Sequence, residues 1–87
     1  MKAIEKLNMG KKSKKPNKGR ITNHIRKIRL EQAALTQEEL AKRVGATRQT
    51  IIAIEAGKYA PSMELAFRIV AEFGAQFEDV FQFDPDG

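Results

Sequence analysis

The chain has 87 residues, a length that accommodates one domain with a single compact core. It contains no cysteine and one histidine, which excludes a disulfide framework and cysteine-ligated zinc and leaves almost no means of building another metal site. No apolar run is long enough to span a membrane, and the N-terminus lacks the apolar segment of a signal peptide. We therefore expect a cytoplasmic protein without a metal or cofactor.

The net charge of +5 is concentrated near the N-terminus. Residues 1–22 carry seven Lys and one Arg against Glu5, a balance of +7, whereas residues 23–87 have a balance of −2. A basic arm on a near-neutral domain is typical of proteins that contact nucleic acid, although a solubilising tail has the same composition. Its low apolar content predicts a disordered basic tail over 1–20, a folded domain over 21–83 and an acidic end over 84–87.

A first amphipathic helix is predicted over about 23–33. Ile21, Ile25 and Ile28 recur at spacings of four and three, which places them on one face, and Thr22 is suited to cap the helix. His24 lies near the helix start, where a lone histidine suits a surface or capping position better than a ligand or catalyst. The opposite face is basic, with Arg26, Lys27 and Arg29.

Two short helices are predicted over 37–44 and 48–56, joined by a tight turn. Thr36 and Glu39 form a capping box at the start of the first helix, and Thr47 can cap the second. Gly45 stands where the first helix must end, and it can adopt a left-handed conformation there. Ala41 is small enough for the helices to approach closely. The pattern predicts a helix-turn-helix, whose inward side chains are Leu40, Ala41, Val44, Ile51 and Ile54.

Two further helices complete the predicted domain. Ser62 and Gly74 bracket a helix over 63–73, and its broad apolar face indicates that it is the most buried helix. Phe77, Val80 and Phe81 mark a short fifth helix. Because the chain shows no alternating pattern typical of strands, we predict a compact all-α, five-helix domain.

One long run of residues carries a family resemblance. The run LTQEELAKRVGATRQTIIAIEAGKYAPSMELAFRIVAEFG closely resembles the Cro/CI-type helix-turn-helix regulators, also called the xenobiotic-response-element family, and the similarity extends from about Ile25 to Phe81. The resemblance implies a lambda-repressor-like DNA-binding fold and a non-enzymatic transcriptional regulator, which we expect to be a repressor. The match is a spaced set: Thr36-Gln37, Leu40-Ala41, Gly45, Arg48-Gln49-Thr50-Ile51, Ile54-Glu55, Gly57-Lys58-Tyr59 and Pro61-Ser62.

The resemblance assigns base reading to the second motif helix, from Arg48 to Ala56, because that helix enters the major groove in the family. The chemistry of two side chains agrees with this assignment. Arg48 can donate two hydrogen bonds to guanine O6 and N7, and Gln49 can pair with adenine N6 and N7. Both lie opposite the inward isoleucines, so core packing does not account for them. Thr47 also joins the base-reading set, although its capping role explains it as well.

The resemblance also implies contacts to the sugar–phosphate backbone, which position a protein without specifying sequence. Gln37 matches a residue that contacts phosphate at the start of the first motif helix, where the helix dipole also favours an anion. Glu55 matches a glutamate that pairs with a first-helix arginine, here Arg29, in a structural role. Lys58 is explained equally well as a solvated loop charge. The full set of expected backbone contacts is Gln37, Thr50, Arg43, Lys42, Lys58 and Tyr59.

The sequence departs from the family pattern at the reading helix and at the first turn. Ile52 and Ala53 occupy outward positions where the family often has polar residues, so they either contact thymine methyls or reduce the number of bases read. The first helix carries one extra residue before Leu35, and Ala34 replaces the Gly or Asn common in that turn. The register of the first-helix arginine is therefore open.

One small domain reads few base pairs, so we expect a homodimer on double-stranded DNA. Phe81 and Phe83 are candidate dimer contacts, and we expect Phe77 to lie in the core of the monomer. An alternative function is that of an antitoxin, which covers a toxin and regulates its own promoter. An enzyme is disfavoured because the sequence shows no nucleophile–base pair, metal cluster or phosphate loop.

Overall fold

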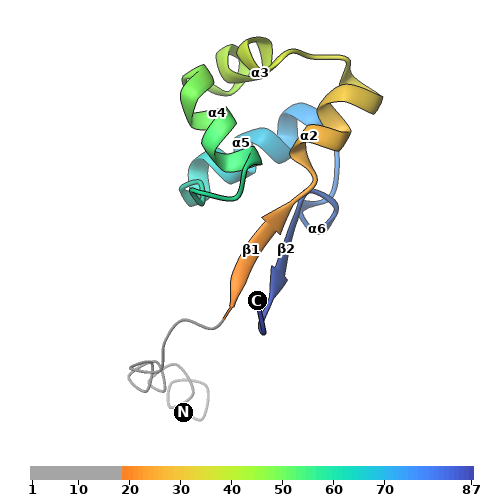
Figure 1. The fold of residues 1–87 in the computed structure, drawn as a ribbon. Helices are drawn as coiled ribbons and strands as arrows, with labels where there is room; N and C mark the ends of the chain where they lie inside the picture. Colours follow the sequence, from red (N-terminus) through yellow and green to blue (C-terminus); the bar gives the residue numbers. More distant parts are fainter. Residues whose placement is uncertain (1–18) are drawn as a thin grey trace, which may run out of the picture.

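A computed structural model describes residues 19–87, which form a helical body with a two-stranded sheet projecting from it (Figure 1). The mostly helical five-helix domain is confirmed, with α2 and η2 together forming the first helix. The predicted tail falls almost entirely on residues 1–18, which lie outside the described part of the chain. The elements are β1 Arg20–Asn23, α2 Ile25–Ile28, the π-helix η2 Arg29–Ala33, α3 Gln37–Val44, α4 Arg48–Glu55, α5 Met63–Phe73, α6 Phe77–Val80 and β2 Phe81–Asp84.

The sheet is the part of the fold that was not predicted from the sequence. β1 pairs antiparallel with β2, so that Arg20 lies opposite Asp84 and Asn23 lies opposite Phe81. The prediction that the domain has no strand was therefore wrong at its two ends. The sheet also includes one residue beyond each predicted domain boundary, because Arg20 was assigned to the tail and Asp84 to the acidic end.

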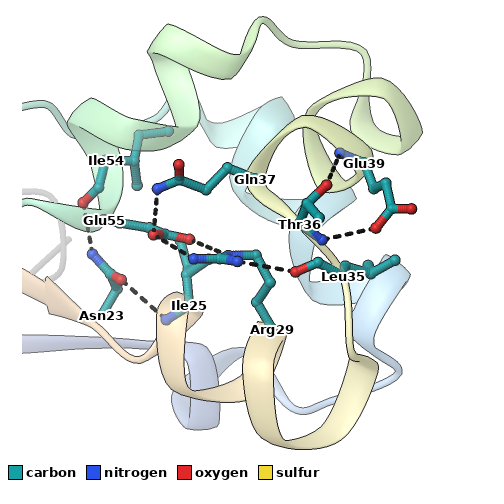
Figure 2. Close-up of polar contacts among 9 residues, drawn as sticks. All are labelled: Asn23, Ile25, Arg29, Leu35, Thr36, Gln37, Glu39, Ile54 and Glu55. Atoms are coloured by element: carbon teal, nitrogen blue, oxygen red, sulfur yellow. Dashed lines mark hydrogen bonds and ion pairs between the residues drawn. The ribbon is translucent and has the colours of Figure 1, made fainter.

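The first helix begins later than its isoleucine spacing predicts. Ile21 and Thr22 lie in β1, and the helix begins at Ile25. Thr22 is not the cap that was predicted: the N-cap residue is His24, whose side chain makes no cap hydrogen bond, and Asn23 Oδ1 accepts a hydrogen bond from the Ile25 N–H at 3.0 Å. Its Nδ2 also donates to the carbonyl oxygen of Ile54 at 2.9 Å (Figure 2). Asn23 therefore ties the start of α2 to the end of α4.

The extra residue of the first helix is absorbed by η2. The N–H groups of Ala34 and Leu35 both donate to the carbonyl oxygen of Arg29, a wider loop than the α-helical hydrogen bond closes. Ala34 then ends the helix with φ of 52°, in the left-handed region that residues other than glycine and asparagine rarely adopt. This turn settles the register of Arg29, which is 5% exposed and faces the motif.

The motif helices begin and end where their capping chemistry predicts. Thr36 Oγ1 accepts from the Glu39 N–H at 3.0 Å, while Glu39 Oε1 accepts from the Thr36 N–H at 2.8 Å. Thr47 Oγ1 accepts from the Thr50 N–H at 3.2 Å at the start of α4. Gly45 ends α3 with φ of 75°, which allows the chain to turn directly toward α4.

In the C-terminal part of the domain, the apolar side chains that are buried differ from those predicted. On α5, Met63 and Phe67 are 72% and 56% exposed, so the prediction that this helix is the most buried was wrong. Phe81 is 7% exposed and belongs to the core, whereas Phe77 is 40% exposed. The expectations for Phe77 and Phe81 are therefore reversed, and Phe81 is too covered by its own chain to serve as a dimer contact. The core comprises Ile25, Ile28, Leu35, Leu40, Ala41, Val44, Ile51, Ile54, Ala66, Ile69, Val80 and Phe81.

Candidate nucleic-acid interface

The outward face of α4 carries two long polar side chains in its first turn. Arg48 and Gln49 are both exposed, and neither has a hydrogen-bond or ion-pair partner within residues 19–87. The opposite face of the helix is fixed in the core by Ile51 and Ile54, which are 0% and 1% exposed. The helix therefore cannot rotate to bury these two polar groups, and both are available to hydrogen-bond with a ligand.

The side chains of Thr47 and Thr50 form hydrogen bonds at the start of α4. Their hydroxyl oxygens lie 3.0 Å apart, in addition to the capping hydrogen bond between them. Any contact of Thr47 with a base shares its hydroxyl with this cap. Ile52 and Ala53 are half-buried, so only part of their apolar surface faces outward. Among the five predicted base readers, Arg48 and Gln49 are thus the ones whose polar groups have no other role in the described chain.

A buried ion pair fixes α4 relative to the first helix (Figure 2). Arg29 Nε donates to Glu55 Oε2 at 2.7 Å, and Arg29 Nη2 donates to Glu55 Oε1 at 3.1 Å. The two side chains are 7% and 5% exposed. Arg29 Nη1 also donates to the carbonyl oxygen of Leu35 at 2.9 Å. The pair that the resemblance implies is present, and it connects the η2 turn to the end of α4.

Gln37 belongs to the same network, which changes its expected role. Its Nε2 donates to Glu55 Oε1 at 3.1 Å, so the side chain is held toward the ion pair (Figure 2). The surroundings are also less favourable to an anion than the helix dipole alone suggests, because Glu38 and Glu39 occupy the first turn of α3. The Thr36 backbone N–H, followed by its side chain, holds the pKa of Glu39 below its ordinary value of 4.5. A phosphate at this position would therefore need cations from other elements.

Arginines from two different helices lie near the start of α3. Arg26 of α2 and Arg48 of α4 line one shallow depression together with Thr36, Gln37 and Glu38. The sequence indicates that the first helix has a basic face, but no binding role was predicted for Arg26. The spacing in the sequence could have indicated this position. Arg26 precedes Arg29 by three residues, so both lie on the same side of the helix, and the ion pair of Arg29 directs that side toward the motif.

The remaining predicted backbone contacts are spread around α4. Lys58 and Tyr59 are exposed in the loop that follows the helix, and Lys42 is exposed on α3. Arg43 differs because its Nη1 lies 3.0 Å from Glu72 Oε2 on α5. Its guanidinium group is therefore committed to an intramolecular ion pair that a phosphate would have to replace.

Two further properties of the described residues bear on the site. No group of three or more His, Asp or Glu side chains among residues 19–87 is placed to hold a metal ion. Across the same residues, the helices are too short and too polar for any of them to cross a membrane.

Comparisons with known proteins find relatives over this segment. The helix-turn-helix family matches residues 25–80. The chain is 60% identical over 52 residues to an uncharacterized HTH-type transcriptional regulator of Methanocaldococcus jannaschii, covering 60% of this chain and 79% of that protein. It is 61% identical over 54 residues to a protein of the same description from Methanothermobacter thermautotrophicus, covering 61% and 78%. A Bacillus subtilis protein of that description is 44% identical over 59 residues, covering 68% and 88%.

A solved structure shares the fold. The crystal structure of a Bacteroides fragilis protein aligns with a TM-score of 0.64 at 19% sequence identity. The alignment covers 71% of this chain and 98% of that chain. Because the identity is low, this likeness concerns the arrangement of the elements and not the side chains of the reading surface.

Proposed function

The chain belongs to the helix-turn-helix family, and on that premise we propose that it is a transcriptional regulator that recognises specific sequences in double-stranded DNA through α4. The observation that carries the proposal is the pair Arg48 and Gln49, exposed and unpartnered within residues 19–87 on a helix that the buried Arg29–Glu55 pair fixes. The relatives described as transcriptional regulators support the same role. We expect this regulator to act as a repressor.

Base recognition in this proposal rests on the first turn of α4. The guanidinium of Arg48 donates two parallel hydrogen bonds to guanine, and the amide of Gln49 donates to and accepts from adenine. A good pair of this kind discriminates against the wrong base by roughly 1–3 kcal/mol. Ile52 and Ala53 add an apolar surface that suits thymine methyl groups, so the readout is partly hydrophobic.

Phosphate contacts on both sides of α4 would hold the helix in register. Arg26 supplies the positive charge that the acidic first turn of α3 lacks, and Lys58 and Tyr59 approach the backbone beyond the other end of α4. Lys42 and Thr50 complete the set. Arg43 contributes least, because binding phosphate would break its ion pair with a neighbouring helix.

A dimer follows from the small size of the reading surface. One domain of this kind contacts few base pairs, whereas two copies related by a twofold axis read half-sites about 34–36 Å apart, one turn of the double helix. We therefore propose a homodimer on a near-palindromic operator.

Selection of binding sites from random DNA duplexes tests the proposal. The full chain should enrich one motif with related half-sites, containing guanine and adenine at the positions read by Arg48 and Gln49. The selection should be run at low salt and micromolar protein, where weak specific binding is still recovered. No enriched motif under these conditions would contradict sequence-specific recognition.

A further inference from the structure

Five exposed apolar side chains gather where the sheet meets α5 and α6. Ile21 and Phe83 lie opposite each other in the two strands, and both are about half exposed or more, at 49% and 63%. Together with Met63 and Phe77 they line one depression. Phe67 joins them through its ring, whose centroid lies 5.4 Å from that of Phe77. We call Ile21, Met63, Phe67, Phe77 and Phe83 the hairpin patch.

The hairpin patch is a contiguous apolar area, larger than a single exposed apolar side chain would give. The three phenylalanines are 40% to 63% exposed, which leaves roughly 300 Å² of aromatic surface in water. Ile21 and Met63 extend this area toward the upper end of the roughly 300–600 Å² that the largest patch on a monomer usually covers. A patch of that size on each of two copies buries about the 1,200 Å² at which stable interfaces begin.

We propose that the hairpin patch is the surface through which two copies of this chain form a twofold-symmetric dimer. The inference deepens the proposed function, because it rests on the homodimer suggested there and assigns its interface. In such a dimer the patch of one copy packs on the same patch of the other, so the surface must be complementary to itself.

The charges around the hairpin patch fit a second copy as its occupant. Among residues 19–87, Glu78 is the only charged residue that lines the depression, so two copies would bring little like charge from the described domain together. At the open end of the sheet, Arg20 and Asp84 lie opposite each other on the two strands. A twofold axis can place each of these charges near its opposite in the partner, whereas a rim of one sign would repel itself.

The position of the hairpin patch leaves the reading surface free. Arg48 and Gln49 do not line the depression, whereas Pro61, in the loop that follows α4, does. The dimer would thus join the two motifs through the segment after the reading helix while its first turn stays open. The same contact also explains why Phe83 and Met63 are exposed on a domain whose core is otherwise closed.

Sedimentation equilibrium of the full chain without DNA tests the inference directly. The wild type should change from monomer to dimer mass as its concentration rises. Met63→Gln with Phe67→Gln on α5, and separately Phe83→Gln on β2, should each raise the dimer dissociation constant by at least about tenfold. Leu30→Gln is the matched control, because Leu30 is also an exposed apolar residue, at 51%, but lies outside the patch. It should leave self-association unchanged.

A second measurement keeps the result independent of folding defects. The chain has no cysteine, so Glu78→Cys, which lines the depression without removing a patch side chain, and Leu30→Cys each introduce a single thiol. Mild oxidation at dimer-forming concentration should cross-link the first variant and not the second. A wild type that stays monomeric throughout, or a dimer that the patch substitutions do not weaken, would overturn the inference. Binding of a duplex with one half-site is scored separately, so loss of DNA recognition is distinguishable from loss of the dimer.

Discussion

At the scale of single residues, Ala34 is the position where side chain and backbone are least compatible. Its φ of 52° is the only positive value among non-glycine residues of the described chain, 19–87. Such a conformation costs an L residue about 1–2 kcal/mol, part of which glycine returns through its greater freedom in the unfolded state. The strain persists because η2 must carry one residue more than an α-helix would hold.

Replacing this alanine by glycine should therefore stabilise the domain. We expect Ala34→Gly to raise the free energy of unfolding by about 0.5–1 kcal/mol in urea titrations. Ala33→Gly is the control, since Ala33 lies inside η2 and glycine there should lower stability by about 0.5–1 kcal/mol. Equal destabilisation by both substitutions would mean that residue 34 does not adopt the left-handed conformation.

The carboxylate of Glu39 makes the stability of the domain depend on pH. Hydrogen bonds from Thr36 lower its pKa in the folded state below 4.5, so its contribution is complete above that value and is lost as pH falls through the lower folded pKa. Glu39→Gln cannot titrate, so its stability should fall less steeply than that of the wild type between neutral and acidic pH. Parallel pH profiles of the two proteins would show that the Glu39 carboxylate does not contribute to the pH dependence of stability.

At the scale of elements, the buried Arg29–Glu55 pair is the contact that positions α4. Arg29→Ala leaves a carboxylate with 5% exposure without its cation, so we expect a loss of about 3–5 kcal/mol in the free energy of unfolding. Arg43→Ala is a matched control, because its pair with Glu72 lies at the surface and should be worth less than about 1 kcal/mol. Thermal unfolding followed by circular dichroism measures both, and similar losses would contradict a special role for the buried pair.

Local chemistry predicted the central elements well. The caps at Thr36, Thr47 and Ser62 and the glycine at the end of α3 depend on residues within one turn of each other, so they are readable in sequence. The sheet depends instead on pairing between the two ends of the domain. Its strands have four residues each, and the alternation of Ile21 with Thr22 is too short to outweigh the helical spacing of the isoleucines.

The exposure of Arg48 and Gln49 was predictable from the sequence, whereas the contacts around them were not. Arg48 and Gln49 follow from the motif and from the inward isoleucines. The hydrogen bond from Gln37 to Glu55 and the position of Arg26 in the same depression as Arg48 depend on how the first helix packs. This packing could not be predicted from the sequence, because a helix can accommodate one extra residue as a bulge, as a longer loop or as a change of register. The structure resolves it as η2.

At the scale of the whole molecule, the charge is divided between a near-neutral domain and a basic N-terminal segment. Deletion of residues 1–19 should make the slope of log K against log salt shallower by about 0.9 for each phosphate that the segment neutralises in the full chain, because each neutralised phosphate releases condensed counterions. The preferred DNA site should not change, since charge neutralisation at phosphates reads no bases. An unchanged slope in fluorescence-anisotropy titrations would assign the segment to solubility or to another partner.

The central claim is that α4 reads bases through Arg48, and site preference measured across single base-pair variants of the selected operator tests it most directly. Arg48→Ala should relax the preference at one base pair in each half-site, with a loss of about 1–3 kcal/mol for the preferred base and little loss for the others. Arg48→Lys keeps the charge without the two-pronged donor, so it should relax the same position. Uniform weakening across all variants, restored by lysine, would make Arg48 a phosphate contact and contradict the claim.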